Sequence, residues 1–150
     1  MFFRSELPEG FKLIDFDTSE VVDMSYMFCS CKIHEGFSLG ARFNTSNVKN
    51  MSFMFSHCKI PSNFSLGDKF GTSKVKDMSH MFSKCEFPAG FFLGTGFDTS
   101  NVINMSGMFS GCKLPAGFIL GHKFKTHNVV DMSFMFSNCK MIQDLQLGDY

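Results

Sequence analysis

The chain has 150 residues, of which 44% are hydrophobic, and this size and composition suit one domain with a sizeable core. Its 14 basic and 14 acidic side chains balance, so no net charge attracts nucleic acid or an anionic membrane, and we expect neither as a partner. No segment approaches the roughly 18 consecutive apolar residues of a membrane helix, and residues 1–8 lack the basic and apolar stretches of a signal peptide, so we expect neither feature.

A 27-residue repeat fills almost the whole sequence. The composition is biased towards 21 Phe, 12 Met and 6 Cys, with no Trp, which indicates internal repetition. When the chain is aligned on Phe16 and every 27th residue after it, ten columns are identical in all five copies. The copies are residues 16–42, 43–69, 70–96, 97–123 and 124–150, and residues 1–15 resemble the second half of a copy. We therefore expect one domain, residues 1–150, made of a half-coil and five coils.

The first half of each copy has the spacing of a short helix. In the second copy, Met51, Met54, Phe55 and Cys58 fall at positions i, i+3, i+4 and i+7, which would place them on one helix face. Asn50 precedes this stripe, and each other copy has Asp or Asn there, the residue types that best cap a helix N-terminus. The pattern predicts a helix of about two turns from the cap to the cysteine, buried against neighbouring coils because so short a helix is unstable alone.

The second half of each copy predicts a short strand. Between Gly36 and Gly40, the apolar Phe37 and Leu39 flank the variable Ser38, which is the pattern of a half-buried strand. One strand per coil would stack into a parallel sheet on one face, and a strand plus a helix in each coil is the leucine-rich-repeat format. The predicted fold is therefore an α/β repeat solenoid that resembles a leucine-rich repeat.

Function in such a protein should lie where the copies differ and the side chain points outwards. In the variable strand column, Phe92 and Ile119 are neighbouring apolar residues where a solvated sheet favours polar ones. We interpret them as an anchor for a protein partner, and the alternative is that the chain or another copy covers this face. The candidate binding residues are Lys12, Ser38, Ser65, Phe92, Ile119 and Gln146. A second variable column holds Tyr26, Phe53, His80, Gly107 and Phe134.

The cysteines form a ladder with one thiol outside it. Cys31 and its equivalents occupy the last core position of each helix stripe, and their 27-residue spacing differs from the two to four residues of a zinc site. We expect buried free thiols there, rather than disulfides or metal ligands. Cys29 lies in a column that is otherwise serine, so it is the one thiol that we expect near solvent. The alternative is a redox or metal site formed by Cys29 and Cys31.

The remaining columns contain no recurring catalytic arrangement. The paired methionine columns suit flexible core filling better than a soft-metal site. The five histidines fall in five different columns, so they cannot stack into a ligand cluster, and none has a recurring Ser or Cys neighbour. The threonine ladder through Thr18 and Thr45 could form a flat ice-binding or glycan-binding row, but hydroxyls bonded to nearby backbone explain it more simply. We therefore expect no catalytic residues, no metal site and no cofactor.

The repeat also resembles a known family. Units such as residues 97–112, with the string FxTSxVxxMSxMFxxC, are similar to the bacterial surface-protein repeat of BspA-like leucine-rich-repeat proteins, and the resemblance covers residues 7–150. It implies a leucine-rich-repeat-like solenoid on cell-surface proteins or lipoproteins, for which adhesion and protein binding are the usual proposals. It implies no catalytic residues, and it implies a cell-surface or secreted location.

These observations together predict a non-catalytic repeat scaffold for protein binding or cell-surface adhesion through the variable strand face. The alternative is a structural spacer or a segment of a self-assembling array. The last copy would leave an apolar surface without a coil above it, which predicts self-association through the C-terminal end. The residues of that surface are Met132, Met135, Phe136, Leu145 and Leu147.

Overall fold

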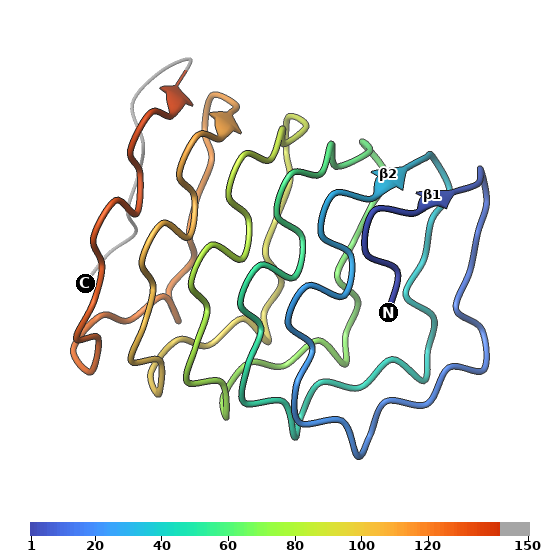
Figure 1. Cartoon of the computed structure of the whole chain (residues 1–150), viewed down its shortest axis with the longest axis horizontal. Helices are drawn as coiled ribbons and strands as arrows, with labels where there is room; N and C mark the ends of the chain where they lie inside the picture. The colour runs from blue at the N-terminus through green and yellow to red at the C-terminus, as the bar shows by residue number, and fades with distance from the viewer. Residues whose placement is uncertain (142–150) are drawn as a thin grey trace.

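The computed structural model of the chain describes residues 1–141, and in it the successive repeats lie side by side as coils (Figure 1). Four short strands are present among these residues: β1 (Glu6–Leu7), β2 (Lys32–Ile33), β3 (Lys113–Leu114) and β4 (Lys140–Met141). β1 pairs with β2 in parallel, and β3 pairs with β4 in the same way. Each pair joins equivalent positions of neighbouring coils.

Single parallel bridges continue this pairing through the coils between the strands. Lys59 is bridged to Glu86, and Glu86 is bridged to Lys113. A second row of bridges runs through the position just before the first conserved methionine of each copy, and its members are Asp23, Asn50, Asp77, Asn104 and Asp131. Both rows keep the 27-residue register of the sequence, so the tandem repeats are also the units of the structure.

The predicted helices are absent from residues 1–141, and that prediction is wrong. Residues 24–31 form consecutive turns instead, in which the amide of Met27 donates to the carbonyl oxygen of Met24 at 3.3 Å and Cys31 donates to Phe28 at 3.0 Å. Tyr26 has a φ of 58°, which is a left-handed conformation that an α-helix does not contain. The same turns recur in the later copies at residues 51–58, 78–85, 105–112 and 132–139.

Hydrogen bonds between coils explain why turns replace the helix. The amides of Tyr26 and Phe28 donate to carbonyl oxygens of the next coil at 3.0 and 2.9 Å, and a helix would use those amides internally. The Asp23 carboxylate accepts from the amide of Ser25 at 2.7 Å, so this residue closes an Asx turn instead of capping a helix. Each amide of residues 24–31 thus has a partner, while the Met, Phe and Cys side chains still point inwards.

The predicted strand lies in a different part of the coil. β-pairing between coils occurs mainly directly after the conserved cysteine, as in β2, and at the row that starts with Asp23. In Gly36–Gly40 and its described equivalents, only Ser38, which is bridged to Lys12, and Ile119 take part in a bridge. Phe37 and Leu39 are nevertheless buried on either side of Ser38, as the alternation predicts. Turns on both sides keep this extended segment short, because the amide of Phe37 donates to His34 and that of Phe43 donates to Gly40, both at 3.3 Å.

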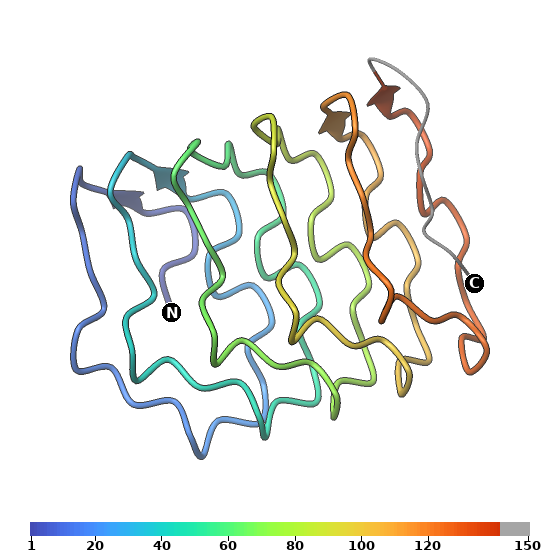
Figure 2. The same cartoon turned by 180° about the vertical axis from the view of Figure 1, so that it is seen from behind.

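Each coil therefore has two broad faces. Residues 24–31 and their equivalents face the viewer in Figure 1, and we call this side the turn face. Residues 36–43 and their equivalents face the viewer in Figure 2, and we call this side the variable face.

A stack of phenylalanine rings fills the space between the faces. The conserved phenylalanine of each turn segment stacks on its counterpart in the next coil, at ring-centroid distances of 5.2 to 5.8 Å and interplanar angles of 3 to 11°. The stack consists of Phe2, Phe28, Phe55, Phe82, Phe109 and Phe136. The paired methionines of the middle copies are buried beside it, which confirms their predicted place in the core. Residues 1–141 contain no helix long and apolar enough to cross a membrane.

Candidate functional site

The variable column forms one row across the variable face. Lys12, Ser65, Phe92 and Ile119 are exposed and Ser38 is half-buried. Phe92 retains 55% and Ile119 46% of its accessible surface, although both lie next to buried leucines of the core. The two predicted anchor residues are thus exposed on neighbouring coils. Gln146, the last residue predicted for this row, lies outside the described residues.

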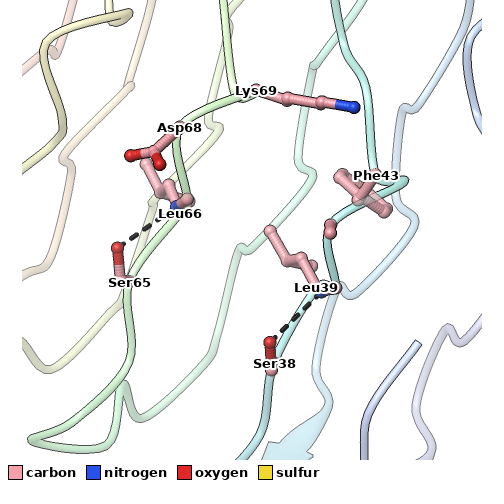
Figure 3. Close-up of a pocket in the computed structure, with 10 residues that line it drawn as sticks. Ser38, Leu39, Phe43, Ser65, Leu66, Asp68 and Lys69 are labelled. Carbon is pink, nitrogen blue, oxygen red and sulfur yellow. Dashed lines mark hydrogen bonds between the residues drawn. The ribbon is translucent and has the colours of Figure 1, made fainter. Parts of the chain in front are cut away.

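A groove crosses this row between the first and second copies. It has a volume of about 300 Å³ and is lined on one side by Ser38–Ala41 with Phe43, and on the other by Ser65–Lys69. Figure 3 shows the two segments running alongside each other, with the hydroxyls of Ser38 and Ser65 turned back onto their own chains. Each hydroxyl accepts a hydrogen bond at 3.2 Å from the amide two residues later. These serines close local turns, so each hydroxyl uses one of its two lone pairs within its own segment.

A second groove lies between the second and third copies. It has a volume of about 330 Å³, and Ser65, Asp68, Phe91 and Phe92 are among the residues that line it. Asp68 lines both grooves and is exposed, so the second groove has an acidic group on one wall and the exposed Phe92 ring on the other. Sequence reasoning identified Phe92 but missed Asp68 and the grooves, because it treated the coils as evenly spaced.

The second variable column forms a partial aromatic stack on the turn face. The rings of Tyr26 and Phe53 stack at 4.7 Å, and those of Phe53 and His80 stack at 4.6 Å. The His80 ring lies against Gly107, where a Cβ atom would come within 2.3 Å of it, so the glycine makes room for the ring. Stacking between coils accounts for these residues without a ligand.

The cysteines only partly match their predictions. Cys58, Cys85 and Cys112 are buried free thiols, as predicted, and burial raises the pKa of Cys58 and Cys112 to about 12. Cys29, the thiol predicted near solvent, is buried as well, so that prediction is wrong. Its turn places the side chain inwards, whereas Cys139 in the last described coil is the half-buried thiol.

The threonine ladder is a set of links between coils. Thr72 is buried, and its hydroxyl donates to the carbonyl oxygen of Asp98 at 2.7 Å and accepts from the amide of Asp98 at 2.7 Å. Thr18 makes the same pair of bonds to Asn44. This confirms that the hydroxyls bond to backbone, although the backbone belongs to the next coil. Buried hydroxyls cannot form the flat ice-binding or glycan-binding row.

No cluster that could bind a metal ion is found within residues 1–141, and one close serine–histidine pair is present there. No three His, Cys, Asp or Glu side chains of this part converge on a point where they could hold a metal ion. Ser56 Oγ lies 2.9 Å from the Nδ1 atom of His57, but it is buried and donates to the carbonyl oxygen of Ser83 at 3.2 Å. Because its proton points to a carbonyl group and its oxygen is enclosed, Ser56 is not an activated nucleophile.

Comparison with known proteins identifies a repeat family. Residues 1–90 and 89–149 each match the family described as Mycoplasma protein of unknown function, DUF285, so two copies of the family pattern cover almost the whole chain. This is a repeat family related to surface-protein repeats. No curated protein and no solved structure matches the chain.

Proposed function

The chain belongs to the DUF285 family, and from this premise we propose that it is a non-catalytic solenoid scaffold that binds a protein partner through its variable face. A solenoid of leucine-rich-repeat type agrees with the parallel 27-residue register of the coils, although turns replace the helices. Repeat solenoids present extended surfaces on which side chains can vary without disturbing the core.

The observation that carries this proposal is the exposure of Phe92 and Ile119 on neighbouring coils. Both side chains project from positions flanked by buried core residues, and Phe92 also lines a groove. Two adjacent exposed apolar side chains beside a groove are the kind of anchor that contributes most to a protein–protein interface. The relation of the family to surface-protein repeats supports a role in adhesion at a cell surface.

A second candidate function is a structural spacer or self-assembling array. The specific observation in its favour is the exposed apolar surface of the last described coil, where Val130 is 85% and Phe134 73% exposed. Of the residues predicted to form a C-terminal association surface, Met132 is exposed, Phe136 is half-buried and Met135 is buried, while Leu145 and Leu147 lie outside the described residues. This function would show as association between copies of the chain that does not depend on Phe92.

A binding assay with matched variants distinguishes the two functions. The chain is tested against a panel of immobilised extracellular proteins, together with a variant that combines Phe92→Ser and Ile119→Ser. The control is Ile103→Ser, because Ile103 lies in the same copy as Ile119 and is 45% exposed, but lines neither groove. We expect the double variant to lose at least about tenfold in affinity and the control to bind normally. Unchanged affinity of the Phe92→Ser, Ile119→Ser double variant, or light scattering that shows only self-association, would contradict the proposal.

A further inference from the structure

Between the first and the fourth copies, neighbouring coils separate on the variable face. Between the half-coil and the first copy, the amide of Ser38 donates to Phe11 and the amide of Leu13 donates to Ser38, both at 3.1 Å. No equivalent bond or bridge joins Ser38 to Ser65, Ser65 to Phe92 or Phe92 to Ile119, whereas Ile119 itself takes part in a bridge again. The turn face keeps its bonds throughout, for example from Phe55 to Met81 at 2.9 Å.

Two equivalent glycines show the same separation independently. A Cβ atom added to Gly40 would lie 2.4 Å from the carbonyl oxygen of Leu13, so the first copy touches the half-coil there. A Cβ atom added to Gly67, at the same position one copy later, would meet nothing within 4 Å. The two grooves lie on either side of the segment that contains Gly67.

Backbone groups without a backbone partner line the opened grooves. Within the described part of the chain, the amides and carbonyl groups of Leu66 and Phe92 make no backbone hydrogen bond, whereas Leu13, the counterpart of Leu66 in the half-coil, is paired through both groups. The first groove runs along the chain direction between two neighbouring segments, one that begins at Ser38 and one that begins at Ser65 (Figure 3). A groove of this shape has donors and acceptors repeating along its length.

We propose that these grooves bind an extended peptide segment of the partner through main-chain hydrogen bonds. This inference rests on the proposed binding function and names the form that the partner takes. An extended peptide brings the alternating amides and carbonyl groups that the groove walls lack, as in the addition of a strand to an open sheet edge. Because the second groove has Asp68 on one wall and Phe92 on the other, it favours a peptide in which a basic residue and an apolar residue project towards these two side chains.

The first experiment uses an array of random peptides of about ten residues, long enough to span the groove when extended. The full chain and its Asp68→Lys variant are both applied to the array. We expect binders of the full chain to be enriched in a basic residue next to an apolar one, and the variant to prefer an acidic residue instead. A failure to enrich any peptide overturns the inference. If no peptide is enriched but a folded protein still binds in a manner that depends on Phe92 and Ile119, only the peptide inference is wrong and the proposed binding function stands.

The second experiment tests the main-chain contacts themselves. The best peptide is synthesised with N-methyl groups on alternate amides, in the two opposite registers. We expect each register to weaken binding by about tenfold or more, because successive amides of an extended chain point to opposite sides and so face opposite walls of the groove. Hydrogen exchange at the amides of Leu66 and Phe92 should slow on binding. Binding of the methylated peptides that is as tight as that of the unmethylated peptide, or preferential binding of glycans on a parallel array, would overturn main-chain recognition.

Discussion

The thiol of Cys58 donates a hydrogen bond to the carbonyl oxygen of Phe28, at 3.1 Å, and so links two neighbouring coils. Cys85 and Cys112 make the same bond to the coil before them, at 3.0 and 2.9 Å. A small apolar side chain with one weak donor suits this site, because it fills the core and satisfies a carbonyl oxygen at the same time.

The buried thiols should therefore be unreactive in the folded protein. Burial raises the pKa of Cys85 well above its ordinary value, so almost no thiolate is present at neutral pH. We expect Ellman's reagent to modify Cys139 first, since it is only half-buried, and Cys29, Cys58, Cys85 and Cys112 only on unfolding. The variant Cys139→Ala should lose the fast phase of the reaction. A fast phase that persists in this variant would show that one of the buried thiols is open to solvent.

Alkaline pH should destabilise the protein through the same thiols. The pKa of Cys58 is raised by burial from its ordinary value of 9.0 to about 12. Between these two values the unfolded chain releases its thiol proton while the folded chain keeps it, so the contribution to stability is complete below pH 9 and is lost as the pH rises towards 12. Urea unfolding of Cys58→Ala should show a shallower loss of stability over this range than the unmodified chain. If the stability of the variant and that of the unmodified chain fell equally steeply between pH 9 and pH 12, burial of the Cys58 thiol would not be the cause of the loss.

The threonine links allow a matched pair of substitutions. Thr72→Val keeps the shape of the side chain but leaves the amide and carbonyl group of Asp98 without their partner inside the protein, which should cost about 1–3 kcal/mol of the free energy of unfolding. Thr126 belongs to the same column but is exposed, so Thr126→Val should change stability by less than about 0.5 kcal/mol. Equal effects of the two substitutions in chemical denaturation would mean that the hydroxyl bonds do not stabilise the fold.

The sequence predicted which residues are buried better than it predicted the backbone. The spacing of Met24, Met27, Phe28 and Cys31 correctly indicates one inward face, but a helix and a run of turns both satisfy that spacing. Hydrogen bonds to the neighbouring coil favour the turns over the helix. The residue spacing within one copy gives no information about these bonds. A local signal did exist in the fourth copy, where Gly107 and Gly111 occupy the two turn positions that have positive φ in every described copy.

The candidate site could likewise be predicted from the sequence only in part. The exposure of Phe92 and Ile119 could be predicted from alternation within one segment. The grooves beside them could not, because Gly40 and Gly67 are the same residue in the same column and differ only in how close the preceding coil lies. The distance between coils is a tertiary property, and a column that holds the same residue in every copy carries no information about it.

The turn conformation itself can be tested with glycine. Lys84 is exposed and has a φ of 56°, which is strained for any residue except glycine, so Lys84→Gly should keep stability or raise it by up to about 1 kcal/mol. Lys76 is also exposed in the same copy but does not have a positive φ, so Lys76→Gly should lower the free energy of unfolding by about 0.5–1 kcal/mol. If residues 78–85 were instead a helix, glycine at position 84 would cost about 1 kcal/mol as well. Urea denaturation of the two variants therefore distinguishes the structures, since equal losses would favour the helix and opposite or unequal effects the turns.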